Sequence, residues 1–475
     1  MKPTALIAGL AAFSLTSMSY AVTVDVTGAT AFRAATLLAI KAQFTASGVA
    51  FQYAHDQAAG NLNTAAPGAT RAIFKGTIRN ATNTANIPNV TVRCSFNGSV
   101  EGINALVNNV NPTYYVDSSA NLITAAAIGG GETHVATAPV ARTTEAAISE
   151  IAFSDVSKDS TPYAALPILG GPVGVVVFTM LGSEGTTFGN VTSQQFRALM
   201  GAGFQPLSLF TGVEADSPLD PAGDGTGANA AWVFATGRND GSGTRTTYLA
   251  ETGYGVSKKV KQYVTGLSSG TALTAIQLVP FAGVATAPQV VPPGGFVQLA
   301  GNASSIWIQN TGIGNDGNGG YSSGSTLRTD MGKTGAAVTV YDETGADAFG
   351  GPQKLTLLTF LSLNDATNAR ANGAVFLAYD GEKLDVTDAG NTAMTATDVA
   401  KVTEGRYTAW GFQQMYLDST IDGVDANPAI AAEEVLQDEV YDSLFTSVQT
   451  NLGIAGLPVS AMHVGRPTDG GVVAP

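Results

Sequence analysis

The sequence is poor in charge and in cysteine. Only 13% of its 475 residues are Asp, Glu, Lys or Arg, whereas ordinary soluble domains contain roughly 25%. The single cysteine, Cys94, cannot form a disulfide within the chain, so a disulfide scaffold is excluded. The 23 Lys and Arg residues face 37 Asp and Glu residues, for a net charge of −14. Nucleic-acid binding through a broad basic surface is therefore excluded, because it needs clustered positive charge.

Residues that could carry metal or nucleophile chemistry are also few. The three histidines stand apart from one another: His55, His134 and His463. With one cysteine besides, this spacing argues against a zinc site, and Cys94 is expected to be a small buried hydrophobic residue. Ser242 lacks the Gly-x-Ser-x-Gly context of a nucleophile elbow. We therefore expect a protein that holds no metal or cofactor and is not an enzyme.

The N-terminus predicts export. Lys2 supplies a positive start, an apolar run extends from Ala5 to Leu15, and Ser19-Tyr20-Ala21 offers small residues at the positions that a signal peptidase reads. This pattern is typical of a secretory signal peptide, here at residues 1–21 and cleaved after Ala21. A short transmembrane anchor is the alternative, although the run is shorter than the ~20 residues of a span. No later stretch is apolar enough to cross a membrane, so we expect a periplasmic or secreted protein.

The rest of the chain alternates between strand-like and helix-like segments, which favours an α/β fold. Strands are predicted at 22–26, 173–178 and 231–236, and helices at about 30–44, 100–107, after the capping box at 192–195, and at about 242–251. Two segments near 55–95 and 110–150 are rich in Ala, Thr, Asn and Gly, and we expect insertions or irregular surface structure there. The length, with 44% hydrophobic residues, predicts two folded domains.

Three turns share one design, in which a strand is followed by a Gly-rich turn with Ser or Thr and then by a helix. They are Thr27-Gly28-Ala29-Thr30-Ala31-Phe32, Phe96-Asn97-Gly98-Ser99-Val100-Glu101-Gly102 and Arg238-Asn239-Asp240-Gly241-Ser242-Gly243-Thr244. A helix N-terminus has unpaired N–H groups and a partial positive charge, so each turn could bind an oxyanion. The alternative for each is ordinary capping of a helix by Ser or Thr.

The third turn carries the most specific pattern. Arg238 supplies a forked, permanently charged donor for an oxyanion, and Asp240 is expected to hold that guanidinium in place. Ser242, Gly243 and Thr244 then offer hydroxyl and backbone donors at the start of the helix. The alternative is a surface turn with an Arg–Asp pair, which contributes little to stability.

This third turn, Arg-x-Asp-Gly-Ser-Gly-Thr, resembles the signature loop of the periplasmic phosphate-binding proteins that serve phosphate ABC importers. Other segments resemble the same family in the same order: Gly28–Phe32, Gly98–Ile103, Ile151–Asp155, the strand 173–178 and the turn Gly314–Gly317. The resemblance implies a fold with two α/β lobes, joined by crossover strands that act as a hinge. It also implies a ligand, inorganic phosphate or a related oxyanion, and an ABC transporter permease as partner.

The resemblance implies the ligand-binding residues as well. From one lobe they are Thr30 or Ala31, Ser99 and Asp155, and from the other Arg238, Asp240, Ser242, Gly243 and Thr244. Asp155 would accept a hydrogen bond from protonated phosphate and repel sulfate, which has no proton to donate; capping of the next turn is the alternative. The lobes are expected at 22–168 and 169–390, with 391–475 returning to the first lobe as far as the C-terminal tail.

The chain departs from the family in two respects. The spacings from Thr30 to Ser99 and from Gly102 to Asp155 are longer than the family's, and Glu101 brings an acid to the second turn, where it would repel an anion or point away. Two other functions therefore stay open. One is an extracellular matrix or surface protein that reuses the fold, and the other is a secreted phosphatase.

Overall fold

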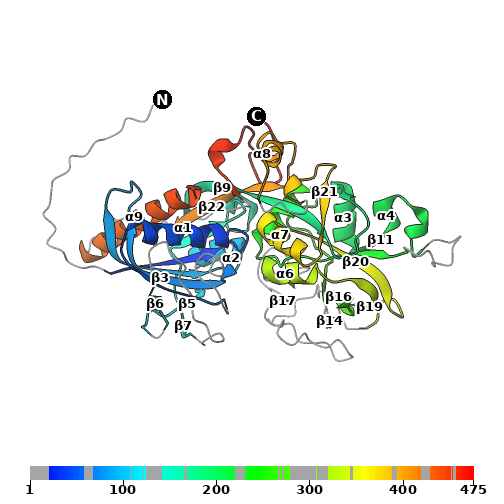
Figure 1. Cartoon of the computed structure of the whole chain (residues 1–475), viewed down its shortest axis with the longest axis horizontal. Coiled ribbons are helices and arrows are strands. Elements are labelled where there is room, and N and C mark those ends of the chain that lie inside the picture. Colours follow the sequence, from blue (N-terminus) through cyan, green and yellow to red (C-terminus); the bar gives the residue numbers. More distant parts are fainter. Residues whose placement is uncertain are drawn as a thin grey trace.

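The computed structural model shows a mixed α/β protein with two lobes that lie side by side (Figure 1). The structure describes residues 21–57, 68–108, 110–119, 121–124, 142–164, 168–219, 230–265, 268–269, 272–278, 306–307, 319–321, 323–342, 346–387, 393–418, 428–450, 452 and 456–475. The predicted signal peptide lies outside these residues except for Ala21. The first strand, β1 (Val22–Gly28), begins directly after the predicted cleavage site. The expected α/β class and two-lobed arrangement are confirmed, while the limits of the domains stay predictions.

Nine helices occur in the described part of the chain. They are α1 (Arg33–Ala46), α2 (Ser99–Asn108), α3 (Ser193–Ala202), α4 (Ser208–Thr211), α5 (Gly243–Glu251), α6 (Gly324–Asp330), α7 (Leu363–Ala371), α8 (Ala396–Thr403) and α9 (Pro428–Thr450). The capping box predicted for α3 is present: the Thr192 hydroxyl accepts from the Gln195 N–H at 3.1 Å, and Gln195 Oε1 accepts from the Thr192 N–H at 2.8 Å. None of these helices is both long and apolar enough to cross a membrane.

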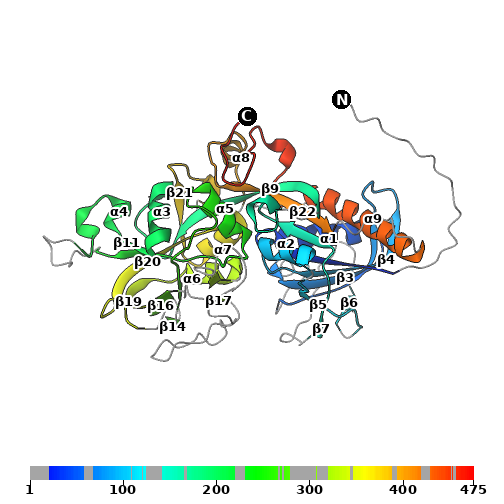
Figure 2. The ribbon, with the colours of Figure 1, turned by 180° about the vertical axis from the view of Figure 1, so that it is seen from behind.

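A long strand, β9 (Ile168–Gly182), links the two lobes. Its first part, from Ile168 to Val177, pairs antiparallel with β22 (Trp410–Asp418). Its last part, from Phe178 to Gly182, pairs antiparallel with β20 (Gln353–Ser362). The β-branched run predicted as a buried strand is thus the element that passes from one lobe to the other, at the centre of the molecule in Figures 1 and 2.

The sheet of the first lobe is built around β1. Parallel to β1 on either side lie β4 (Asn86–Ser95) and β8 (Ile151–Ser154), and β22 pairs with β8. Helix α9 packs beside α1: Ser447 Oγ donates to the Ala39 carbonyl at 3.0 Å. The other strands of this lobe are β2 (Gln52–His55), β3 (Arg71–Arg79), β5 (Thr113–Tyr115), β6 (Ile123–Thr124), β7 (Thr144–Ala146) and β23 (Gly456–Leu457).

The expectation of irregular structure over 55–95 is wrong for 71–79 and 86–95, which form β3 and β4. Alternate residues of β4 point into the core, and Val90, Val92 and Cys94 are each 0% exposed. A two-residue period of buried apolar side chains is the pattern of a strand, and it is easily overlooked here because Thr, Asn and Arg occupy the positions between. Cys94 is a free, buried residue as expected, and burial raises the pKa of its thiol.

The second lobe has its own sheet and its own core. Strand β12 (Trp232–Ala235) runs parallel to β20, and β21 (Val375–Tyr379) is antiparallel to β9. Side chains such as Phe234, Tyr248 and Leu358 form the core of this lobe. Its other strands are β10 (Asn190–Val191), β11 (Phe204–Pro206), β13 (Tyr263–Thr265), β14 (Ser268–Ser269), β15 (Ala272–Leu273), β16 (Ala275–Leu278), β17 (Ile306–Trp307), β18 (Gly320–Tyr321) and β19 (Gly335–Tyr341).

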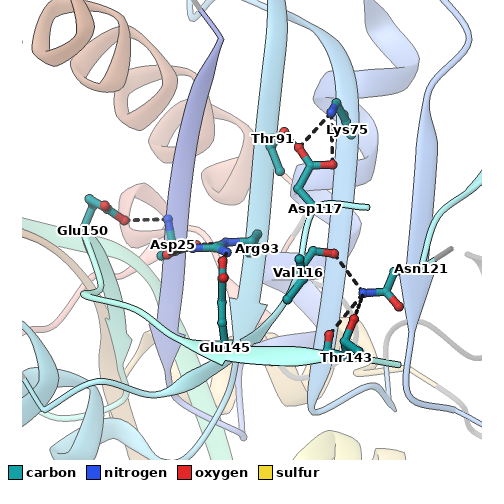
Figure 3. A network of polar contacts seen from close by, with 10 residues as sticks. All are labelled: Asp25, Lys75, Thr91, Arg93, Val116, Asp117, Asn121, Thr143, Glu145 and Glu150. Atoms are coloured by element: carbon teal, nitrogen blue, oxygen red, sulfur yellow. Dashed lines mark hydrogen bonds and ion pairs between the residues drawn. The ribbon is translucent and has the colours of Figure 1, made fainter. Parts of the chain in front are cut away.

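Ionic contacts hold part of the 110–150 segment to the first sheet (Figure 3). Asp25 of β1 lies beside Arg93 of β4, whose Nε donates to Asp25 Oδ1 at 2.6 Å. Arg93 also pairs with Glu145 of β7, and the Glu150 carboxylate accepts a 2.6 Å hydrogen bond from the Asp25 N–H. The described parts of the segment therefore pack on the sheet through short strands and buried charges, and residues 125–141 lie outside the description.

Candidate functional site

The three Gly-rich turns come together where the two lobes meet. The Gly98 N–H donates to the Gly28 carbonyl at 2.9 Å, which joins the first and second turns within one lobe. The Val100 N–H donates to the Gly241 carbonyl at 3.2 Å, which joins the second turn to the third across the junction. A Cβ at Gly98 would lie 2.4 Å from that carbonyl oxygen, so this close approach requires glycine. Helices α2 and α5 lie on either side of the junction in Figure 2.

Asp155 lies at the centre of this meeting point. It follows β8 directly and is 1% exposed. Its carboxylate accepts a hydrogen bond from the Ser99 hydroxyl in its own lobe and a 3.0 Å hydrogen bond from the Thr244 hydroxyl in the other. Burial raises the pKa of Asp155, while these two hydroxyls and the charge of Arg238 oppose the rise. The carboxylate is thus a buried acceptor that both lobes share.

Arg238 is fully enclosed at the start of the third turn. It is 1% exposed, and its Nε donates to the Tyr321 carbonyl at 3.0 Å, which fixes the base of the guanidinium. Burial lowers the pKa of Arg238 to about 10, against the charges of Asp155 and Asp365. The group remains a cation at neutral pH, close enough to Asp155 for their charges to interact. Tyr321 is a residue that the sequence analysis missed, since it acts through its backbone.

Asp240 and Arg238 have different charged neighbours. The cation whose charge acts on Asp240 is Arg245 of α5, whereas the acids that act on Arg238 are Asp155 and Asp365. The expected role of Asp240 in holding the Arg238 guanidinium stays a prediction. Burial, with the nearby charge of Glu101, raises the pKa of Asp240 to about 7, and its buried Oδ1 has no hydrogen-bond partner within the described structure. Glu101 thus lies towards this acid of the third turn.

The three residues at the start of α5 have different roles. The Ser242 hydroxyl caps the helix by accepting from the Arg245 N–H at 3.4 Å, which is the capping alternative stated for this turn. Thr244 donates to Asp155, as described above. At Gly243, a Cβ would lie 1.7 Å from Asp155 Oδ1 and 2.5 Å from Ser99 Oγ. Only glycine allows α5 to approach Asp155 this closely.

The first turn reaches the junction as well. Thr30 and Ala31 are buried, with 6% and 7% of their surfaces exposed, and Ala31 packs with the core of the second lobe although the chain places it in the first. The next charged residue, Arg33, is 4% exposed, and its charge acts on Arg238. Sequence reasoning passed over Arg33, although a cation at the N-terminus of a helix is unfavourable for the helix dipole and is a signal to note.

The turn Gly314–Gly317, which the family resemblance singled out, lies outside the described residues. Within the described chain, no group of three or more His, Cys, Asp or Glu side chains has the arrangement of a metal site. The arrangement at the junction offers a buried carboxylate, hydroxyls, helix N-termini and guanidinium groups, which are the elements of an anion site rather than of a metal centre.

No protein-family model and no curated protein matches this chain. Among solved structures, it is similar to a putative phosphate ABC transporter substrate-binding protein with bound phosphate from Clostridium perfringens, with a TM-score of 0.34, 11% identity, and coverage of 92% of this chain and 99% of that chain. An ABC-type phosphate transport receptor from Vibrio cholerae gives a TM-score of 0.35, 10% identity, and coverage of 88% and 96%. PstS from Borrelia burgdorferi gives a TM-score of 0.29 and 10% identity, with coverage of 89% of this chain and 97% of that chain. TM-scores this low assign neither ligand nor function, so both must be argued from the residues themselves.

Proposed function

We propose that this chain is an exported solute-binding protein that captures phosphate, or a closely related oxyanion, between its two lobes. The observation that carries the proposal is the environment of Asp155. A carboxylate that is 1% exposed accepts hydroxyl hydrogen bonds from Ser99 in one lobe and Thr244 in the other. Burial of a carboxylate lowers the stability of the folded protein. A role in ligand binding accounts for its presence at the junction.

The chemistry of Asp155 and Arg238 supports phosphate over sulfate. Arg238 supplies positive charge in a water-poor setting, where electrostatic attraction is stronger than at the surface. Asp155 supplies a further acceptor, and among tetrahedral oxyanions only one that carries a proton can donate a hydrogen bond to it. Phosphate keeps at least one proton at neutral pH, whereas sulfate has none and would face carboxylate repulsion.

Binding requires the lobes to move. The direct contacts of Gly243 with Asp155 and Ser99 leave no room even for a Cβ, so a ligand must enter when the lobes separate. The strand β9, which pairs with β22 on one side and β20 on the other, is the element about which such a hinge motion would occur. An exported protein of this kind would deliver its ligand to an ABC transporter permease.

Isothermal titration of the mature protein with inorganic phosphate tests the proposal, after unfolding, dialysis and refolding have removed any ligand that co-purifies. We expect saturable heat with phosphate and none with an equal concentration of sulfate. No heat with phosphate would overturn the proposal. In that case, self-assembly without phosphate would favour the surface-protein alternative, and turnover of a phosphomonoester would favour the phosphatase.

A further inference from the structure

We propose that Arg33 is a second anion-binding residue of this site, which donates to the same bound oxyanion as Arg238 but from the opposite lobe. The inference rests on the proposed function and deepens it. It assigns a role to a residue outside the three turns that the sequence singled out, and it makes the ligand a bridge between two guanidinium groups.

The position of Arg33 in the fold is unfavourable without an anion. Arg33 is the first residue of α1, and the N-cap, Phe32, contributes no side-chain hydrogen bond to the helix. The first turn of α1 contains no acidic residue either. The positive end of the helix dipole and the positive charge of the guanidinium therefore lie together at this end of α1, where an anion would relieve both.

The guanidinium of Arg33 is also incompletely satisfied. Arg33 is 4% exposed, and its buried Nη1 has no hydrogen-bond partner in the described structure. A buried donor without an acceptor costs stability, and the cost is larger for a charged group. An oxyanion oxygen is the acceptor that a guanidinium N–H binds best.

The start of α1 lies at the junction with the second lobe, because Ala31, two residues before Arg33, packs with the core of that lobe. The charges of Asp365 of α7 and Arg328 of α6 act on the Arg33 guanidinium from that lobe, and Asp56 acts on it from its own lobe. Arg33 in turn acts on Arg238. Asp365 already forms a 3.0 Å ion pair with Arg328, so its single negative charge serves several guanidinium groups.

The acceptors near this junction already have partners. Asp155 accepts from Ser99 and Thr244, and Asp365 pairs with Arg328, whose side chain is partly exposed. Neither carboxylate is a hydrogen-bond partner of the buried Arg33 Nη1 in the described structure. A bound oxyanion between Arg33 and Arg238 supplies the missing acceptor, and it also draws the lobes together, because each guanidinium belongs to a different lobe.

The test is the affinity of four variants for inorganic phosphate, measured by isothermal titration. Arg33→Gln is expected to weaken binding about 10- to 100-fold, which corresponds to the loss of a charged hydrogen bond. Arg33→Lys keeps the charge but loses the fork, so its affinity should lie between those of Arg33→Gln and the wild type. Arg79→Gln removes a cation from the far end of β3 in the same lobe, where Arg79 binds Asn83 and Asn86, and should bind phosphate like the wild type.

The fourth variant, Asp365→Asn, separates the proposal from a purely structural role for Arg33. If Arg33 binds the anion, removal of a competing carboxylate leaves phosphate affinity unchanged or increases it. If Arg33 serves only as a partner of Asp365, then Asp365→Asn and Arg33→Gln weaken binding alike, and the proposal is overturned.

Equal affinity of Arg33→Gln and wild type for phosphate also overturns the proposal for Arg33, while the proposed function stands. Absence of phosphate binding by the wild type removes the proposed function first. The phosphate-induced rise in melting temperature gives the same comparison for a variant too unstable to titrate.

Discussion

The hydroxyl of Thr244 donates a 3.0 Å hydrogen bond to Oδ2 of Asp155, and this bond joins two residues that are 89 positions apart and belong to different lobes. The Thr247 hydroxyl, one turn further along α5, donates to the Asp155 carbonyl at 3.0 Å. Helix α5 therefore binds both the side chain and the backbone carbonyl of one residue in the opposite lobe. Contact between the lobes at this point thus depends on hydrogen bonds to Asp155.

Replacement of Thr244 by Val should weaken phosphate binding about 10-fold or more. The substitution keeps the shape of the side chain and removes the donor to a charged acceptor, whose loss costs roughly 1.5–3 kcal/mol. Thr246→Val is the matched control, because the Thr246 hydroxyl bonds only to the Ser242 carbonyl of its own helix among the contacts described. Titration calorimetry of both variants checks the prediction, and equal affinities for the two would contradict it.

Replacement of Asp155 by Asn should alter selectivity more than affinity. The amide can still accept from one hydroxyl, and it no longer repels an anion that lacks a proton. We expect phosphate to bind more weakly than to the wild type, and sulfate, which we expect the wild type to reject, to bind measurably. Competition titrations with the two anions give the ratio of their dissociation constants. A variant that still rejects sulfate would mean that Asp155 does not set the selectivity.

Replacement of Gly243 by Ala should prevent closure without damage to either lobe. The added Cβ would lie 1.7 Å from Asp155 Oδ1 and 2.5 Å from Ser99 Oγ, so the contact between the lobes cannot form. Alanine in a helix is otherwise favourable over glycine by about 1 kcal/mol. We expect the loss of phosphate binding by at least about 100-fold and a larger radius of gyration in small-angle scattering.

The control for this variant is Gly201→Ala in α3. A Cβ at Gly201 would meet its nearest neighbour, the Tyr254 ring, at an ordinary 3.9 Å. Both variants add one methyl group to a helix, so only the position of the clash distinguishes them. Wild-type affinity in Gly243→Ala would show that the lobes do not need this contact to bind the ligand.

Local patterns made much of this site predictable from the sequence. Ser99 and Ser242 stand at helix starts directly after Gly-rich turns, and this pattern is visible in the sequence. These features depend on neighbours within a few residues. Asp155 is indicated only by the resemblance to a known family. The resemblance of the third turn to a known loop then predicted that residues far apart in the chain would meet.

What escaped prediction depends on contacts across the chain. The charge of Arg245 acts on Asp240, and only the three-dimensional course of α5 brings these two residues near each other. The burial of Arg33 follows from the packing of two lobes, which no pattern within α1 contains. The expectation of irregular structure failed at β4 because polar residues alternate with its apolar ones, and its place between β1 and β3 is set by pairing over long distances.

The C-terminal segment should contribute strongly to stability through Arg466. Its Nη1 lies 2.8 Å from Glu251 Oε2 at the end of α5, with side chains 1% and 8% exposed, and its guanidinium stacks 4.1 Å from the centre of the Trp410 ring. Arg466→Met leaves the Glu251 carboxylate buried without this partner. Loss of one member of a buried pair costs about 3–5 kcal/mol of unfolding free energy.

The double variant Arg466→Met/Glu251→Gln tests the cause of that loss. If an unpaired buried charge is responsible, the second substitution restores part of the stability that the first removes. Urea unfolding of the wild type, both single variants and the double variant gives the coupling free energy. A double variant less stable than the wild type by the sum of the two single-variant losses would mean that the two side chains act independently.

The carboxyl group of Glu150 should make stability fall as the pH rises. Burial raises the pKa of Glu150 from 4.5 to about 8, with the charge of Asp25 adding to the rise. Between these values the folded protein binds a proton that the unfolded chain has released, so the unfolding free energy decreases with pH and levels off above about 8. Glu150→Gln removes this titration, while its side-chain oxygen can still accept from the Asp25 N–H.

We therefore expect Glu150→Gln to melt at a higher temperature than the wild type at pH 8, and the difference to shrink towards pH 4.5. Each unit of pKa difference corresponds to about 1.4 kcal/mol, so the gain at pH 8 should reach a few kcal/mol at most. Glu404→Gln removes a half-exposed carboxylate at the end of α8 and controls for the change in net charge. Melting curves across this pH range decide the matter: parallel curves for Glu150→Gln and wild type would mean that Glu150 is ionised in the folded protein at neutral pH.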